Sequence, residues 1–225
     1  MSDAMLNEQV EVTKGKMVMN QIPADIVGES PLHHADLETL ASRGQGQGGV
    51  HLKEKSLQGL LILRAKPDEA QMAEIESVLG VALPTTPLTS VEMAGEKGDV
   101  SVRWVSPDEW FIVVPATVAF QLESDFQTSV SGHYSLVNVS SGYTILQLSG
   151  DNVVDVLKKS TPIDVHPSVF SVGKVVSSVF AKSGAMMLRR TGDNAFELII
   201  RRSFADYIWL WLQDASMEYG LVIEA

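Results

Sequence analysis

From about residue 57 onward, the apolar positions alternate between short runs typical of buried strands and stripes typical of amphipathic helices. The run at 60–63 predicts a buried strand, and apolar residues at helical spacing follow it. Asp68 has the position of an N-cap for this helix, and Gly80 is placed to end it. Two more strands are predicted at 100–105 and 110–114, joined by a turn.

The second half of the chain repeats this order of strand, helix, strands and helix. Its final helix has the most regular apolar stripe in the sequence, with apolar residues recurring every three or four positions over 204–215. The other predicted elements are a strand at 144–148, a helix opening at Asp151, and strands at 175–180, 186–190 and 196–200.

The two halves can be laid on each other. Leu60–Asp68 matches Tyr143–Asp151 at an offset of 83, and Val102–Val114 matches Met187–Ile199 at an offset of 85. Such spacing predicts an internal duplication, and two copies favour a closed α+β domain with pseudo-twofold symmetry over a solenoid. We therefore expect a single duplicated domain over 57–225, with one repeat at about 57–130 and the other at about 136–217.

The first 56 residues differ in their pattern of apolar and polar positions: the apolar residues show no regular spacing, and residues 43–49 form a glycine-rich run. Polar, glycine-rich chain of this kind has little apolar surface to bury. We interpret 1–56 as an extended N-terminal arm and a glycine-rich linker, with one short helix at Ala35–Ala41.

Composition narrows the classes of function. The 225 residues carry a net charge of −11, opposite in sign to what a nucleic-acid binder needs, and the acidic excess lies mainly before residue 141. Solubility explains this excess more simply than attraction to a basic partner does. There is no cysteine, which excludes disulfides and thiolate chemistry. We expect no membrane span, no signal peptide and a cytoplasmic location.

Several motifs that could indicate a functional site lack the sequence context that such a site requires. Gly44, Gly46 and Gly49 satisfy G-x-G-x-x-G, but no strand precedes them and no helical stripe follows, which favours a linker. The adjacent His33 and His34 point in different directions on a helix or a strand, which argues against a metal site. No nucleophile elbow or P-loop is present. We therefore predict no catalytic, cofactor-binding or metal-binding residue.

Four residues are candidates for a partner interface. Arg189, Arg201 and Arg202 belong to basic doublets, which suit either ordinary surface charge or bidentate contacts to another protein. Trp209 lies off the main stripe of the last helix, so that helix is either buried on several sides or docked on a partner.

Five segments resemble the gamma subunits of heterotetrameric sarcosine oxidase. The longest is Phe196–Trp211, which is similar to the family's F-x-L-x-V-x-R-S-F-A-x-Y-L-W-x-W signature. Trp104–Trp110 resembles W-x-x-P-D-E-W, and Val137–Gly142 with Leu146–Gly150 resembles the V-D-V-S-x-G and L-x-L-S-G pair. Thr161–Pro167 resembles C-P-x-D-L-H-P.

The resemblance implies a fold like the folate-binding domain of aminomethyltransferase and a non-catalytic role in assembly. It implies a complex that oxidises sarcosine to glycine, passes a one-carbon unit to tetrahydrofolate and releases hydrogen peroxide. It also implies that the alpha and beta subunits hold FAD, FMN and NAD, that delta holds zinc, and that gamma packs mainly on alpha.

The alternative is a free-standing folate-binding protein of the aminomethyltransferase-like superfamily. The iron–sulfur maintenance type of that superfamily carries a K-G-C-Y motif, which a chain without cysteine lacks. An enzyme of another class has no positive support in the sequence.

Overall fold

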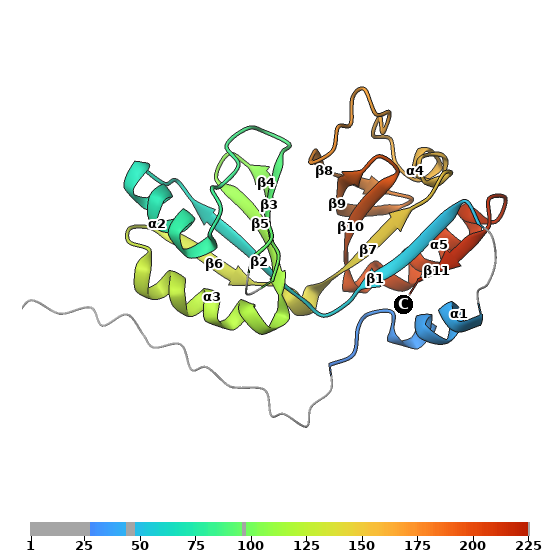
Figure 1. Ribbon diagram of the computed structural model, residues 1–225, viewed down its shortest axis with the longest axis horizontal. Helices are drawn as coiled ribbons and strands as arrows, with labels where there is room; N and C mark the ends of the chain where they lie inside the picture. Colours follow the sequence, from blue (N-terminus) through green and yellow to red (C-terminus); the bar gives the residue numbers. More distant parts are fainter. Residues whose placement is uncertain (1–27, 44–47, 96–97, 225) are drawn as a thin grey trace, which may run out of the picture.

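The computed structural model describes residues 28–43, 48–95 and 98–224, and within them two β-sheets face each other between outer layers of helices (Figure 1). The first sheet has the order β3 (Ser90–Met93), β4 (Val100–Ser106), β5 (Glu109–Pro115), β2 (Gln58–Ala65) and β6 (Tyr134–Asn138). The second has the order β11 (Leu221–Ile223), β1 (Val50–Lys55), β7 (Tyr143–Ser149), β10 (Ala195–Arg201), β9 (Ser183–Gly192) and β8 (Val175–Phe180).

Helices cover the outer face of each sheet. The first sheet packs against α2 (Glu69–Leu79) and α3 (Ala116–Ser129). The second packs against α4 (Val153–Ser160) and α5 (Ala205–Ser216), with α1 (Leu37–Arg43) beside β11. Short 3-10 turns lie at His33–Ala35, Ser140–Gly142 and Arg202–Phe204.

Strand alternation explains the layers, because successive side chains of a strand point to opposite faces. On β5, Ile112 packs toward α2 and α3, whereas Phe111 and Val113 pack into a third apolar cluster between the sheets. The predicted α+β class is thereby confirmed. The local helix signals are confirmed too: Asp68 Oδ1 accepts a hydrogen bond from the backbone N–H of Gln71 at 2.9 Å, and Gly80 ends α2 at a φ of 76°.

The duplication includes an exchange of strands that the sequence did not reveal. The first repeat runs β1-β2-α2-β3-β4-β5-α3, and the second runs β6-β7-α4-β8-β9-β10-α5. Each repeat's leading strand pairs with the other repeat, because β1 is antiparallel to β7 and β6 is antiparallel to β2. Figure 1 shows β1 in the half that contains β7, after which the chain crosses to β2 in the other half.

Strand register corrects the predicted offset of 85 for the second hairpin. In the first repeat Arg103 pairs with Phe111, and in the second Arg189 pairs with Glu197, so an offset of 86 preserves every such pairing. At an offset of 85, Phe111 would match Phe196, yet these two rings face opposite sides of their sheets. The prediction was one residue out because it relied on matching Asp108 with Asp193 and Phe111 with Phe196.

The predicted linker boundary at residue 56 also differs from the structure. Residues 50–55 form β1, whose Val50 and Leu52 are fully buried in the second sheet. The predicted helix at Ala35–Ala41 corresponds to the turn His33–Ala35 followed by α1. Residues 1–27 of the predicted arm and 44–47 of the glycine-rich run lie outside the described residues.

We predict that the chain unfolds in a single transition, because the exchanged strands tie each sheet to both repeats. Leu52→Ala in β1 removes a fully buried side chain and should lower the free energy of unfolding by about 2–5 kcal/mol. Val137→Ala in β6, where the side chain is 49% exposed, is the control and should cost far less. Urea unfolding followed by circular dichroism measures both, and two separated transitions would contradict the single-domain prediction.

Candidate functional site

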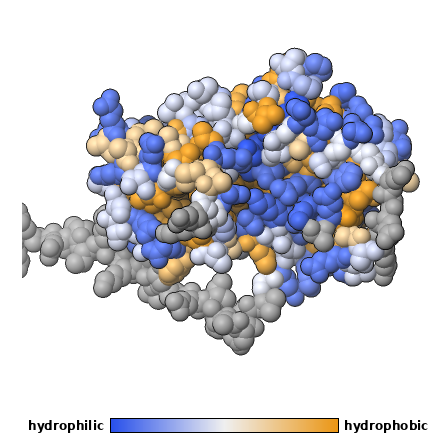
Figure 2. All heavy atoms as spheres, viewed as in Figure 1, coloured by the Kyte–Doolittle hydropathy of each residue, from blue (hydrophilic) through white to orange (hydrophobic). Residues whose placement is uncertain are grey.

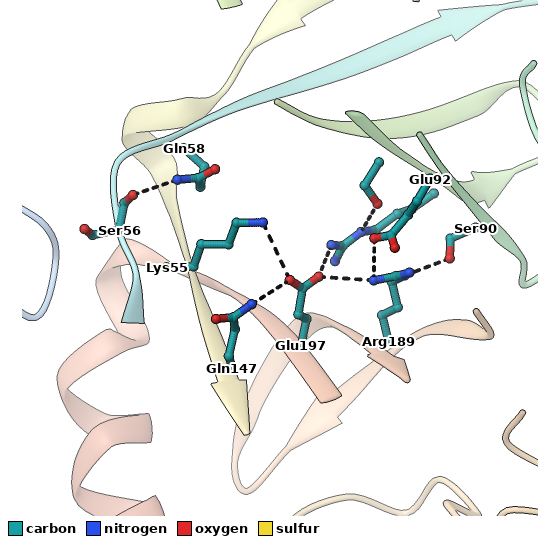
Figure 3. A network of polar contacts seen from close by, with 10 residues as sticks. Lys55, Ser56, Gln58, Ser90, Glu92, Gln147, Arg189 and Glu197 are labelled. Carbon is teal, nitrogen blue, oxygen red and sulfur yellow. Dashed lines mark hydrogen bonds and ion pairs between the residues drawn. The ribbon is translucent and has the colours of Figure 1, made fainter. Parts of the chain in front are cut away.

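A cluster of charged side chains lies between the inner faces of the two sheets (Figure 3). Arg103 on β4, Arg189 on β9 and Glu197 on β10 are only 1%, 4% and 5% exposed. Charged residues are rarely this buried unless they are paired. The cluster is therefore the most unusual chemical feature of the fold.

The Glu197 carboxylate is the centre of the cluster, and both of its oxygens are engaged. The Arg103 guanidinium donates to Oε2, and Nη1 of Arg189 lies 3.4 Å from the same oxygen. On the other side, Nζ of Lys55 is 3.8 Å from Oε1, and the Gln147 amide donates to Oε1 at 3.2 Å. Side chains from four strands of the two sheets thus converge on one carboxylate.

Arg189 makes a second connection between the sheets. Its Nη1 lies 2.7 Å from Oε1 of Glu92 on β3, and its Nε donates to the Ser90 hydroxyl at 2.8 Å. That hydroxyl donates in turn to the carbonyl of Gly173, just before β8, at 2.8 Å. These contacts fasten the β3 edge of the first sheet to the β8–β9 edge of the second.

The electrostatics of the cluster favour the fully charged state. Burial opposes ionisation of Glu197, but attraction from Arg103, Lys55 and Arg189 outweighs it and holds the pKa of the carboxyl below 4.5. Burial also lowers the pKa of Arg103, and the Glu197 charge opposes that shift. An arginine stays protonated under all ordinary conditions. The cluster is thus a charged contact and offers neither a free acid nor a free base.

The duplication explains where these arginines come from. The offset of 86 relates Arg103 to Arg189, so the two side chains occupy equivalent positions in the two repeats. The same offset relates Glu197 to Phe111, so one carboxylate serves both arginines. Within the described residues, Nη1 of Arg103 is buried without a hydrogen-bond partner. The arrangement holds two sheets in one register, and its donor set suits no bond-making chemistry.

Figure 2 shows hydrophilic residues gathered along β1 on one face of the molecule. Lys55 lies at the end of β1, and its side chain is 34% exposed while its amine reaches Glu197. The charged contact therefore extends from the interior to this face.

Two of the predicted interface residues are almost fully buried. Arg189 is paired with carboxylates of its own chain. Trp209 on α5 is 6% exposed and packs in the core, but it also lines the groove between α1, α5 and β11, so its contact with a partner stays a prediction. Arg190, the neighbour of Arg189, is also buried, and it donates to the carbonyl of Phe170 at 2.8 Å. Arg201 and Arg202 are exposed at the end of β10 and remain predictions for a partner contact.

The motifs set aside earlier show no ligand-binding arrangement in the described residues. His34 contacts Asp206 at 2.9 Å on the surface, and among the described residues no group of three or more His, Asp or Glu side chains could hold a metal. Gly49 packs so closely on Asn152 that a Cβ at this position would lie 2.1 Å from the Asn152 side-chain oxygen. Close packing therefore explains the glycine. Gly44 and Gly46 lie outside the described residues.

Sequence reasoning missed Arg103 and Glu197. The available signal was a single charge inside an apolar strand, as in Val-Arg-Trp and Phe-Glu-Leu. A charge at such a position points either to solvent or to a buried partner, and only the tertiary structure decides between the two.

We predict that Glu197→Gln destabilises the protein by about 3–5 kcal/mol, because it leaves Arg103 buried beside Arg189 without their shared anion. Arg103→Met should cost less, because Glu197 keeps Arg189 and Lys55. Glu92→Gln is the control: this carboxylate is 51% exposed, and its loss should cost about 1 kcal/mol or less. Equal urea midpoints for Glu197→Gln and Glu92→Gln would contradict the central role of Glu197.

The same carboxylate predicts a pH dependence. Because folding lowers the pKa of Glu197 below 4.5, its ionised form contributes stability that is fully present above that value and is lost as pH falls through the folded pKa. Urea midpoints measured from about pH 7 down to pH 3 should fall more steeply for the wild type than for Glu197→Gln. Parallel curves for the two proteins would show that Glu197 does not titrate as described.

No helix among the described residues is long and apolar enough to cross a membrane. The family described as sarcosine oxidase, gamma subunit family, matches residues 64–218, which run from the end of β2 to just past α5. The sarcosine oxidase subunit gamma of Corynebacterium sp. (strain U-96) is 30% identical over 192 residues, which are 85% of this chain and 91% of that relative.

Solved structures agree with the sequence comparison. A chain of the heterotetrameric sarcosine oxidase from Corynebacterium sp. U-96 is similar with a TM-score of 0.73 and 27% identity, over 85% of this chain and 96% of that chain. Aminomethyltransferase T of Bartonella henselae is similar with a TM-score of 0.60 and 15% identity, over 86% of this chain and 51% of that chain, which shows a shared fold alone. The folate-binding-domain-like fold is thus confirmed, and this chain belongs to the sarcosine oxidase gamma subunit family.

Proposed function

We propose that this chain is the gamma subunit of a heterotetrameric sarcosine oxidase in the cytoplasm, and that it supports assembly without carrying a reaction of its own. Two observations carry the proposal: the family match covers residues 64–218, which include most of both repeats, and the similar oxidase chain is covered over 96% of its length. A free-standing folate-binding protein that shared only the fold would not be expected to match this family over so much of its length.

The interior chemistry supports a role without catalysis. A general acid or base needs a carboxyl that can exchange a proton near neutral pH. The most buried carboxylate among the described residues, Glu197, is held ionised by surrounding cations and contacts the protein on both oxygens. Its position explains how the sheets are joined and provides no access for a substrate.

In the proposed complex, the reaction belongs to the other subunits. Sarcosine is oxidised to glycine there, the one-carbon unit passes to tetrahydrofolate, and hydrogen peroxide is released. The alpha and beta subunits would hold FAD, FMN and NAD, and the delta subunit would hold zinc. Gamma would pack chiefly on alpha, with beta and delta in the same assembly.

The test is to tag this chain, purify it from its own cells, and measure the native mass and the flavin absorbance of what is recovered. We predict a yellow heterotetramer. After dissociation, the purified and flavin-free chain should form no sarcosine-dependent peroxide, whereas the complex should. Turnover by the flavin-free chain would overturn the proposal of a non-catalytic role.

A colourless, solitary chain would contradict the subunit role altogether. In that case, titration of the chain with tetrahydrofolate would test the free-standing folate-binding alternative, for which the shared fold alone is a weak argument.

A further inference from the structure

The outer face of α5 exposes two large apolar side chains. Leu210 is 56% exposed and Met217, directly after the helix, is 77% exposed. They are seven residues apart, which is about two helical turns, so they lie on the same face. The opposite face of α5 packs against the core, where Ile208 and Leu212 are completely buried.

A groove runs beside these two residues. It has a volume of about 520 Å³ and lies between α1, α5 and β11. Leu40, Leu221 and Ile223 form much of its apolar wall. The strand β11 is also the last strand of its sheet, so no further described strand pairs with its outer edge. Apolar side chains, a groove and a sheet edge thus meet in one place.

The internal duplication provides a comparison for this face. The offset of 86 that relates the two hairpins also relates the buried residues of α3 to those of α5: Ala119 to Ala205, Leu122 to Ile208, and Phe126 to Leu212. At the same offset, Leu210 corresponds to Ser124 and Met217 corresponds to Ser131. The first repeat is therefore polar where the second is apolar, so the fold itself does not require apolar residues at these positions.

Among the described residues, the only charged side chain that lines the groove is an acid, Asp214. A second acid, Asp206, lies one turn before Leu210 on the same helix, is exposed, and contacts His34 at 2.9 Å. An apolar surface flanked by carboxylates is complementary to an apolar segment that carries lysine or arginine.

We infer that the outer face of α5, together with its groove against β11, is the surface on which another subunit of the oxidase docks an apolar segment flanked by a basic residue. This inference rests on the proposed function and names its contact surface. Leu210 and Met217 supply the buried apolar contacts. Asp214 supplies the charge that meets the basic residue.

The main experiment compares three versions of the tagged chain, each expressed in its own cells without the wild-type copy, and a fourth version carries Asp214→Asn. The first is wild type. The second is Leu210→Ser with Met217→Ser, which gives α5 the side chains that the first repeat carries at these positions. The third is Phe120→Ser on α3, a matched control that removes a side chain exposed to a similar degree, 42%. The flavin absorbance recovered per tagged chain and the native mass report the assembly.

We predict that the double variant recovers at least about tenfold less flavoprotein than wild type, while Phe120→Ser recovers as much as wild type. Asp214→Asn should weaken recovery severalfold at low salt, with the difference vanishing at high salt. All four residues are exposed or line a surface groove, so circular dichroism and thermal unfolding of the variants should match the wild type.

The outcomes separate the inference from the function on which it rests. If wild type recovers flavoprotein and the double variant recovers as much, the docking surface is wrong and the subunit role stands. If Phe120→Ser loses recovery to the same degree as the double variant, the contact is not specific to α5 and the inference also fails. If wild type recovers no flavoprotein, the proposed function fails and the docking surface with it.

Discussion

The structure depends on one buried carboxylate that two arginines share across the joint between the sheets. An unpaired charge at such a depth costs several kcal/mol, so Arg103, Arg189 and Glu197 are stable only when both sheets are in the observed register. The apolar cluster beside them stabilises contact between the sheets but tolerates sliding, because apolar contacts have little directionality. The exchange of β1 and β6 then makes each repeat incomplete without the other.

Because the contacts between the inner faces hold the two sheets together, the outer surfaces of the helices in the two repeats can carry different residues. The three buried positions of α3 all correspond to buried positions of α5, whereas two outer positions differ: Ser124 and Ser131 in the first repeat correspond to Leu210 and Met217 in the second. At these two positions the same framework is thus polar in one repeat and apolar in the other. The proposed subunit role gives that difference a reason.

Local signals in the sequence were sufficient for most elements. Strand alternation, the Asp68 cap and the Gly80 stop all depend on neighbours within a few residues, and the structure agrees with them. The strand β1 was missed because Val50 and Leu52 are its only apolar residues and it follows a glycine-rich run, so its pairing with β7 could not be read locally.

Burial could not be predicted for the candidate interface residues either. The alternation places Arg189 on one face of its strand, but only the first sheet, which packs against that face, decides whether the side chain meets solvent. The arginine doublet therefore looked like surface charge. The predicted offset between the two hairpins was wrong for a similar reason. Similar residues in and near two turns constrain an alignment less than the pairing of the strands does.

The most direct test of the whole account is hydrogen–deuterium exchange of the purified chain, alone and within the complex recovered from its cells. Exchange reports where backbone amides become protected when a partner covers them. We predict slower exchange over α5 and β11 in the complex, with α3 little changed. Protection spread over α3 and absent from α5, or equal exchange in both samples, would contradict it.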